Sequence, residues 1–591
     1  MNRIAQEAQF TTSDNYPLFF RHWPATNTPA KGVVVLFHRG HEHSGRMAHL
    51  VDELGLEDYA FYAWDARGHG RSPGERGFSP SIGRSVRDMD EFVRFAAGRE
   101  GLQVSDVAVI AQSVGAVLAA TWVHDYAPAI RCLTLASPAF KVKLYVPLAV
   151  PGLKLMHKLR GNFFVNSYVK AKFLTHDQAR IDSYNSDPLI TRPISVNILL
   201  GLYEAAARVV SDAGAIQVPV QMFISGSDWV VHKPPQERFF QGLGSAIKEL
   251  HQLPGFFHDT LGERDRAPVV VKISEFIRAR FAVAPAPASL LNAHKEGYSF
   301  TEFSRLQQPL PWYSPKRWQF ALTKTMMRKV GGMLSDGVKL GWETGFDSGS
   351  TLDYVYRNTA SGRGFLGRRI DRSYLDAIGW RGIRQRKIHL QQVLQKAIQQ
   401  LQDRQQPVHV LDIAAGHGRY DLEAIAPLAH KPESVLLRDF SPLNVTQGQA
   451  LIESMGLQHI VRFVRGDAFD PASITNLEPR PTLAVVSGLY ELFPDNTMVQ
   501  ASLNALGEVV QPGGYLIYTG QPWHPQLEFI ARVLSSHRGG QDWVMRRRVQ
   551  AEMDQLVAAA GFSKCYTLAD DWGIFTVSIA QKPAEAMLTT T

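Results

Sequence analysis

The chain has 591 residues, of which 45% are hydrophobic, 20% charged and 10% aromatic, with a formal net charge of +8. This composition is typical of a globular protein of two or three domains and excludes collagen-like and disordered chains. The two cysteines, Cys132 and Cys565, lie too far apart for a disulfide framework or a cysteine metal site. The first residues lack the apolar segment of a signal peptide, and no apolar run is long enough to span a bilayer. We therefore expect a cytoplasmic protein without a bound metal.

An alanine and proline run at residues 282–289 divides the chain. Alternating prolines disfavour helix in the residues before them, so the run predicts a semi-rigid linker. Strand and helix patterns alternate on both sides of it. We predict a first domain at residues 1–281, a helical cover segment at residues 290–406 and a last domain at residues 407–591.

The first domain contains apolar runs that are typical of buried parallel strands, each ending in a polar loop. They occupy residues 33–37, 60–64, 107–111, 131–137 and 220–225. The third run leads into Ser113, which has Ala111 two residues before it and Gly115 two residues after it. A strained serine between a strand and a helix needs small residues at those positions, so the pattern predicts a nucleophile elbow.

Two further residues complete the chain order of a catalytic triad. Asp228 follows the strand pattern at residues 220–225, and His258 follows the alternating pattern at residues 249–253. Ser113, Asp228 and His258 thus have the nucleophile, acid, histidine order of α/β hydrolases. An isolated residue of each kind is usually structural, but three in this order at predicted strand ends predict a triad.

The surrounding loops resemble those of the monoglyceride lipase and lysophospholipase branch of the α/β hydrolases, over about residues 10–281. The matching segments are residues 37–46, 65–72 and the elbow. The resemblance implies that Ser113 attacks an acyl ester, that His258 transfers the proton and that Asp228 orients the imidazole. It also implies that the amides of Gly40 and Val114 bind the oxyanion.

One residue of the oxyanion loop departs from the family pattern. Arg39 stands where the family has a glycine, which puts a large cation beside the loop. The backbone conformation of the loop is therefore not fixed by the resemblance.

The insertion at about residues 139–211 corresponds to the cap of that family. Its apolar segment contains Pro147 and Pro151, so we do not expect one long helix there. No acidic residue occurs between Asp125 and Asp177, although the stretch carries several lysines and two arginines. A basic amphipathic cap fits peripheral contact with an anionic membrane, and a cap whose apolar residues only cover the pocket fits equally well.

The cover segment at residues 290–406 shows no strong strand pattern and ends in a predicted helix near residues 388–401. Its interleaved aromatic residues and arginines suit stacking on RNA, or a pocket for a small molecule or a lipid headgroup. Nucleic acid is disfavoured because no RNA-binding module is recognisable. The glycine-rich stretch at residues 341–350 lacks the ending of a phosphate loop.

The last domain begins with a strand pattern that ends at Asp412 and runs into a glycine-rich turn before a helix. Glycines there let the backbone approach a ligand at a helix N-terminus. Later strand patterns at residues 434–439, 460–467, 482–487 and 511–519 follow the same alternation. The set resembles class I S-adenosylmethionine-dependent methyltransferases over about residues 407–582.

That resemblance implies S-adenosylmethionine as the cofactor, with contacts from loops at strand ends. Asp412, Gly416 and Gly418 are expected around its methionine part, with Ala414 in place of the first glycine of the motif. Asp439 is expected on the ribose. Asp467 and Ala468 are expected on the adenine.

The methyl acceptor is less readable from sequence. The segment after residue 487 lacks the Asn/Asp-Pro-Pro-Tyr/Phe motif of enzymes that methylate planar amino groups, which disfavours nucleobase or glutamine amines. Polar and aromatic residues at two predicted strand ends are the candidates for the acceptor site. They are Tyr490, Glu491, Gln521, Trp523 and His524.

The sequence therefore predicts a bifunctional α/β protein, in which an α/β-hydrolase fold with a helical cap precedes a Rossmann-like methyltransferase fold with a helical cover. The predicted activities are hydrolysis of an acyl ester, such as a monoacylglycerol or lysophospholipid, and methylation of a small molecule or lipid headgroup. Peripheral contact with the inner membrane is part of this prediction. Three alternatives stay open: a soluble metabolite as the common substrate, a lipid-binding or scaffolding protein with one inactive half, and an RNA-directed methyltransferase.

Overall fold

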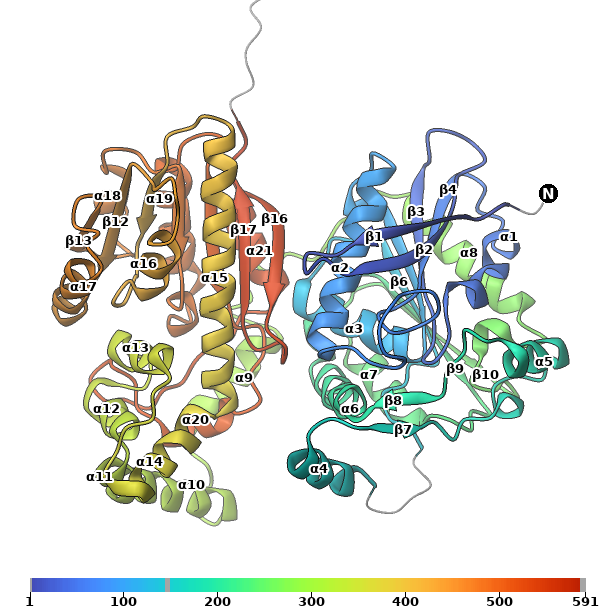
Figure 1. Cartoon of the computed structure of the whole chain (residues 1–591), viewed down its shortest axis with the longest axis horizontal. Coiled ribbons are helices and arrows are strands. Elements are labelled where there is room, and N and C mark those ends of the chain that lie inside the picture. The colour runs from blue at the N-terminus through green and yellow to red at the C-terminus, as the bar shows by residue number, and fades with distance from the viewer. Residues whose placement is uncertain (1–2, 144–148, 585–591) are drawn as a thin grey trace, which may run out of the picture. The chain divides into compact units, whose positions relative to one another are not determined.

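The computed structural model describes residues 3–143 and 149–584 (Figure 1). The chain divides into two compact units, Met1–Ala288 and Ser289–Thr591. The alanine and proline run at residues 282–289 has no helix or strand and lies at the boundary between them. Among the described residues, no helix is both long and apolar enough to cross a membrane.

The first unit is built on an eight-stranded sheet in the order β1-β2-β4-β3-β5-β6-β9-β10. The β1 and β2 strands pair antiparallel, β2 pairs antiparallel with β4, and the remaining neighbours are parallel. The predicted α/β-hydrolase fold is thereby confirmed. The strands are β1 Gln6–Thr11, β2 Pro17–Trp23, β3 Gly32–Phe37, β4 Tyr59–Trp64, β5 Val107–Gln112, β6 Cys132–Ala136, β9 Val220–Ser225 and β10 Lys248–Leu253.

Helices cover both faces of this sheet because the central strands are apolar along their whole length. The apolar stripe of α8 packs on one face through Ile273, Phe276 and Ile277. Each such buried side chain contributes roughly 1.5–3 kcal/mol relative to an exposed one. The helices are α1 His49–Glu53, α2 Ile82–Arg99, α3 Val114–Tyr126, α7 Lys233–Gly242 and α8 Ala267–Phe281.

The cap is the insertion between β6 and β9. Its described part contains a short antiparallel pair and three α-helices: α4 Ala149–Arg160, β7 Phe164–Asn166, α5 Gln178–Ser186, β8 Pro193–Ser195 and α6 Val196–Ser211. Pro151 is the third residue of α4, where a helix does not need its amide. The predicted break at Pro147 lies outside the described residues.

The second unit is built on a seven-stranded sheet in the order β13-β12-β11-β14-β15-β17-β16. The strand β17 runs antiparallel to the other six strands, and every pair that does not include it is parallel. This is the predicted Rossmann-like arrangement. The strands are β11 His409–Asp412, β12 Ser434–Asp439, β13 Val461–Arg465, β14 Leu483–Val486, β15 Tyr515–Gly520, β16 Ser563–Ala569 and β17 Thr576–Gln581.

The sheet of the second unit carries helices between its strands. They are α16 Arg419–Ile425, α17 Pro442–Ser454, α18 Pro471–Thr475, α19 Asn496–Val509, α20 Leu527–Val533 and α21 Gln550–Ala559. The long helix α15 packs on α16 and on the strands β15 and β17. It begins ten residues before the start predicted from its apolar spacing, at Ile378 rather than Ile388, and the earlier turns contain glycines and arginines that hide the pattern.

The cover segment is helical, as predicted, and belongs to the same compact unit as the sheet. The helices α10 to α14 gather at one end of that unit, and α15 runs from there along most of its length (Figure 1). The helical elements of the segment are α9 Tyr298–Gln307, α10 Pro315–Met326, the π-helical turn η6 Met327–Gly331, α11 Gly332–Leu334, α12 Asp336–Thr344, α13 Gly349–Arg357, α14 Gly364–Leu375 and α15 Ile378–Asp403.

Candidate active sites

Ser113 occupies a strained turn between β5 and α3. Its backbone has φ 55° and ψ −115°, in a region that non-glycine residues rarely adopt. A Cβ atom added to Gly115 would lie 2.5 Å from the carbonyl oxygen of His38 and 2.9 Å from that of Phe37. Only glycine fits there, as the elbow pattern predicted.

The three predicted triad residues lie in hydrogen-bond contact. The Oγ atom of Ser113 is 2.7 Å from Nε2 of His258, and Nδ1 of His258 is 2.8 Å from Oδ2 of Asp228. The other Asp228 oxygen accepts hydrogen bonds from the amides of Val230 and Val231, at 2.7 and 2.9 Å. Burial alone would raise the pKa of Asp228, but the electrostatic interaction with His258 and these hydrogen bonds outweigh it and lower that pKa. The carboxylate is therefore ionised and able to orient the imidazole.

Gly40 and Val114 meet beside the serine. A Cβ atom on Gly40 would lie 3.1 Å from Cγ2 of Val114, and both residues line a small cavity of about 50 Å³. Val114 is the first residue of α3, where a helix leaves its amide without an intrahelical acceptor. This arrangement suits an oxyanion site.

Arg39 is held in a buried ion pair rather than left beside the oxyanion loop as an unpaired cation. Its Nε and Nη2 atoms donate to the two Glu42 oxygens at 2.8 and 2.6 Å. Glu42 also accepts from Nε of Arg46 at 3.3 Å, and Arg39 lies 3.9 Å from Asp259, the residue after the triad histidine. Desolvation opposes the Arg39 charge, but Glu42 and Asp259 outweigh it and raise the Arg39 pKa.

In the second unit, a cavity of about 740 Å³ lies at the carboxyl ends of the parallel strands. Gly416, with φ 61°, turns the loop after β11 toward Asp439, whose Oδ2 accepts from the Gly416 amide at 3.0 Å. The cavity is lined by most of the predicted cofactor residues: Ala414, Gly416, Asp439, Asp467 and Ala468.

Asp412 and Gly418 lie behind the loop instead of in the cavity lining. Asp412 is fully buried, and its oxygens accept hydrogen bonds from the Ala414 amide at 2.8 Å and the Tyr420 hydroxyl at 2.5 Å. A Cβ atom on Gly418 would lie 2.5 Å from Leu437. These two residues shape the loop. Their placement does not support direct contact with the methionine part of a cofactor.

This cavity fits S-adenosylmethionine. Asp439 and Asp467 supply carboxylates, the positive φ of Gly416 brings the loop backbone to the cavity, and the buried Oγ of Ser487 has no hydrogen-bond partner among the described residues. The bound cofactor would supply the methyl group.

A second cavity, of about 460 Å³, shares lining residues with the first. Its wall is mainly aromatic and apolar, with Trp380, Trp543, Met545 and Phe575 around it. We call it the acceptor cavity and the larger one the donor cavity. Five residues line both: Asp347, Leu352, Arg386, Gly488 and Leu492.

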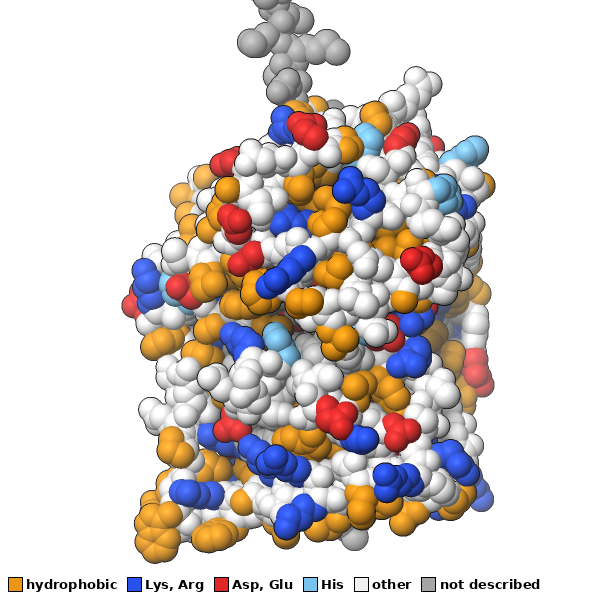
Figure 2. Space-filling model, turned by 90° about the vertical axis from the view of Figure 1, so that its left-hand side faces the viewer, with side chains coloured by type: hydrophobic (Ala, Val, Ile, Leu, Met, Phe, Trp, Pro, Cys, Tyr) orange, Lys and Arg blue, Asp and Glu red, His pale blue; other side chains and the backbone are white. Residues whose placement is uncertain are grey.

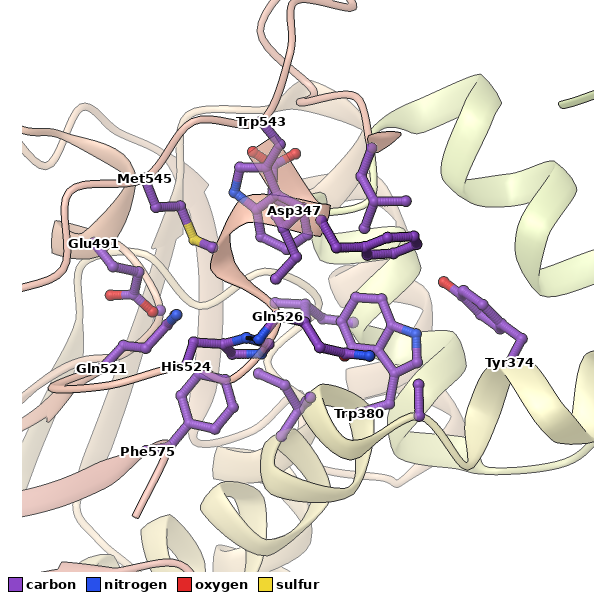
Figure 3. Close-up of a pocket in the computed structure, with 18 of the residues that line it drawn as sticks. Asp347, Tyr374, Trp380, Glu491, Gln521, His524, Gln526, Trp543, Met545 and Phe575 are labelled. Atoms are coloured by element: carbon purple, nitrogen blue, oxygen red, sulfur yellow. Dashed lines mark hydrogen bonds between the residues drawn. The ribbon is translucent and has the colours of Figure 1, made fainter. Parts of the chain in front are cut away.

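Of the five acceptor-site candidates, the structure brings three to the acceptor cavity, and Tyr490 and Trp523 do not line it. Glu491, Gln521 and His524 line it (Figure 3). Tyr490 does not line it, because its side chain is buried and its hydroxyl lies 3.0 Å from Oγ of Ser502.

His524 has the character of a hydrogen-bond donor. Its Nδ1 accepts from the Gln526 amide at 3.0 Å, so the neutral ring carries its proton on Nε2. Burial lowers the pKa of His524 to about 4, which keeps the ring neutral near pH 7. Nε2 of Gln521 and Nε1 of Trp543 are buried donors without a partner among the described residues.

The sequence did not identify the cover residues that line the donor cavity. Arg386 of α15 lies between the cavities, with Nη1 3.3 Å from Oε1 of Glu491. Residues 343–344 and 347–350 also line the donor cavity. The one sequence feature that coincides with these residues is the glycine-rich stretch at residues 341–350. In the sequence it indicated only that the segment is not a phosphate loop.

Residues 273–582 match the family described as "Putative methyltransferase", and residues 28–265 match the family described as "Serine aminopeptidase, S33". The first match spans more than half of the chain. The chain belongs to this methyltransferase family. The methyltransferase domain and the α/β-hydrolase domain predicted from the sequence are thus both confirmed.

The chain is 58% identical to the Escherichia coli (strain K12) protein named "Uncharacterized protein YnbC", over 98% of this chain and 99% of that protein. The hydrolase domain is similar to the monoacylglycerol lipase of Mycolicibacterium smegmatis, at 25% identity over 42% of this chain and 89% of that protein. The solved structure of the Paleococcus ferrophilus monoacylglycerol lipase covers 47% of this chain and 99% of its own, at 22% identity and a TM-score of 0.40.

Proposed function

We propose that the chain is a bifunctional enzyme, a serine hydrolase of acyl esters joined to an S-adenosylmethionine-dependent methyltransferase. The observation that carries the first activity is the continuous hydrogen-bonded row of Ser113, His258 and Asp228. The observation that carries the second is a donor cavity that shares a wall with an apolar acceptor cavity.

In the hydrolase reaction, His258 takes the proton of Ser113 as Oγ attacks the ester carbonyl. The amides of Gly40 and Val114 stabilise the oxyanion, and His258 then protonates the leaving alcohol. Water hydrolyses the acyl-enzyme by the same proton transfers in the second half of the reaction. Asp228 keeps the imidazole in the required tautomer.

The substrate that we favour is a monoacylglycerol or a lysophospholipid. Relatives of the hydrolase domain include monoglyceride lipases and a Bacillus subtilis protein named "Phospholipase YtpA", which is 26% identical over 42% of this chain. The cap supports a lipid substrate as well, because α4 exposes Leu155, Met156 and Leu159 next to Lys154 and Lys158. We expect this basic helix to contact anionic membrane peripherally.

The hydrolase assignment is tested by labelling with a fluorophosphonate, followed by hydrolysis of monoacylglycerol, lysophospholipid and short soluble esters. We expect the wild-type chain to be labelled and Ser113→Ala to be unlabelled. Labelling that persists in Ser113→Ala would place the nucleophile elsewhere. Comparable rates on soluble and lipid esters would contradict the lipid substrate and leave the hydrolase itself standing.

For the methyltransferase, we propose an acceptor that is mainly apolar and carries one polar group. Glu491 lines the acceptor cavity 3.3 Å from Arg386 of the shared wall, and it can accept a hydrogen bond or proton from that group. His524 can donate from Nε2. A small molecule or a lipid meets this description.

The methyltransferase assignment is tested with labelled S-adenosylmethionine and a cellular lipid extract. We expect methyl transfer into an extractable product, and a loss of about 100-fold in Glu491→Gln with cofactor binding unchanged. Tyr490→Phe is the matched control, because its side chain lies outside the acceptor cavity. Absence of cofactor binding in calorimetry would overturn the assignment.

A further inference from the structure

The helix α10 turns a row of large apolar side chains toward solvent. Trp318, Leu322 and Met326 follow one another at four-residue spacing, so they lie on one side of the helix, and they are 66%, 66% and 53% exposed. Val330 and Met333 continue the exposed row through η6 and α11. Helices of globular proteins normally pack such a row inward. Here it remains uncovered.

Neighbouring segments enlarge the row into one surface. Trp312 and Tyr313, just before α10, are 74% and 70% exposed, and Phe365 and Leu366 are exposed at the start of α14. The start of α14 packs against α11, since the Arg363 amide donates to the Leu334 carbonyl at 2.9 Å. We call this surface the apolar face. It consists of Trp312, Tyr313, Trp318, Leu322, Met326, Val330, Met333, Phe365 and Leu366.

The segment that carries most of the apolar face is rich in positive charge, although Glu528 and Asp542 from other segments pair with Lys316 and Lys324 of α10. No acidic residue occurs between Glu302 and Asp336. Figure 2 shows lysine and arginine side chains across the lower part of this side of the molecule, where Figure 1 places α10, α11 and α14. Five exposed cations make no ion pair within the part of the chain that the structure describes: Arg317, Lys329, Arg363, Arg368 and Arg369.

The same helices line the acceptor cavity with their other sides. Met327 and Gly331 of η6 contribute to its wall, and so do Ile370, Ser373 and Tyr374 of α14. A π-helical turn is rare and is frequent at functional sites. The acceptor cavity is thus separated from the apolar face by the thickness of single helices.

We propose that the apolar face is a membrane-docking surface that inserts into the headgroup region of an anionic phospholipid bilayer. Exposed tryptophan and tyrosine are typical of residues at a membrane interface, and unpaired arginine and lysine are attracted to anionic headgroups. Nine large apolar side chains exposed on neighbouring segments are unusual for a protein that stays in water. A two-fold contact with a second copy would bring the unpaired cations of both copies together, which disfavours that occupant.

This surface goes beyond the proposed activities and is independent of the cap contact through α4. Docking would place the acceptor cavity next to the bilayer, so a lipid acceptor could enter without crossing water. The test therefore has to separate the two surfaces and to work whether or not methyl transfer is observed.

The experiment is sedimentation of the full chain with vesicles of phosphatidylcholine alone or mixed with phosphatidylglycerol. We expect binding to the mixed vesicles and a loss of about tenfold or more in the triple variant Trp318→Ser, Leu322→Ser, Phe365→Ser. The matched variant Leu155→Ser, Leu159→Ser changes two exposed residues of α4, and we expect it to keep at least half of the binding. Circular dichroism establishes that each variant is folded. Unchanged binding in the triple variant would overturn the proposal.

Two further measurements identify what the surface touches. Brominated phospholipid should quench tryptophan fluorescence in wild type and much less in Trp312→Phe, Trp318→Phe. The charge variant Lys329→Glu, Arg369→Glu should lose the preference for phosphatidylglycerol. If gel filtration instead showed that the triple variant converts a dimer to a monomer while vesicle binding is unchanged, the apolar face would be an interface between copies and the proposal would be wrong.

Discussion

The triad and the acceptor cavity differ in whether their polar atoms already have partners. At Ser113, His258 and Asp228, each functional atom contacts the next one at hydrogen-bond distance. In the acceptor cavity, Nε2 of Gln521 and Nε1 of Trp543 are buried without partners among the described residues. The protein alone satisfies the hydrogen bonds of the triad, whereas the donors of the acceptor cavity need a ligand to provide their acceptors.

The largest effect is expected from His258→Ala, which removes the imidazole that links Ser113 to Asp228. We expect kcat for ester hydrolysis to fall about 10⁴- to 10⁶-fold, because the serine loses its general base. Steady-state hydrolysis of a chromogenic ester measures it. Calorimetric affinity for S-adenosylmethionine is the control and should not change. A loss below about tenfold would mean that the hydrogen-bonded row is not catalytic.

The next effect concerns Asp439→Ala in the donor cavity. The Asp439 carboxylate lines that cavity and also receives the Gly416 amide. Hydrogen bonds to charged groups contribute about 1.5–3 kcal/mol, so we expect the affinity for S-adenosylmethionine to fall about 10- to 100-fold. Isothermal calorimetry measures it, and esterase activity is the control. Unchanged affinity would remove Asp439 from the proposed ribose contact.

A smaller effect is expected from the buried carboxyl pair behind the donor cavity. Burial raises the pKa of Asp412 to about 7, and burial beside Asp412 raises that of Asp421. Both ionise near 4 in the unfolded chain, so the folded state binds more protons above that pH. The resulting stability is complete below about pH 4 and is lost as pH rises through 7.

Asp421→Asn should weaken this pH dependence. We expect the variant to be more stable than wild type by about 1–2 kcal/mol at pH 8.5, with the difference shrinking toward pH 6. Thermal unfolding of the full chain measures it, using the transition that S-adenosylmethionine shifts. If stability changed equally with pH in wild type and variant between pH 6 and 8.5, Asp421 would not contribute to the pH dependence.

The smallest effect is expected from a change that tests whether the polar atoms of the acceptor cavity wait for a ligand. Gln521→Leu removes an unpartnered buried donor, so we expect the ligand-free chain to be unchanged or stabilised by no more than about 1 kcal/mol. Methyl transfer should nevertheless fall. Urea unfolding and product formation measure the two. A destabilisation of several kcal/mol would show that Gln521 has a structural role, as residues of an already completed network do.

The same difference explains how far the sequence could be interpreted. Ser113, Asp228 and His258 were found because a triad has a fixed chain order and each member follows a buried strand. Both sheets could be predicted for a similar reason, since continuous apolar runs between polar loops are typical of buried parallel strands. Ala414, Gly416 and Asp439 were predicted as cofactor residues from the resemblance to class I methyltransferases.

What the sequence did not show depends on contacts between distant segments. Arg386 lies on a helix predicted only from residue 388 onward, and nothing in its neighbours indicates that it separates two cavities. Tyr490 was predicted beside Glu491 at a strand end, yet the short helical turn Tyr490–Leu492 sends adjacent side chains in different directions. Asp412 follows the family motif, but its oxygens are occupied by Ala414 and Tyr420.

The π-helical turn Met327–Gly331 connects α10 to α11 and determines how far α11 is rotated about the helix axis relative to α10. Each residue turns an α-helix by about 100°, and a π turn accommodates one residue more than the α-helical hydrogen-bond pattern allows. Removing one residue from this turn would rotate Met333 away from the side that carries Trp318 and Leu322. The length of a single turn thus determines whether both ends of the stretch present the same side to their surroundings, which makes it a position where insertions and deletions are tolerated poorly.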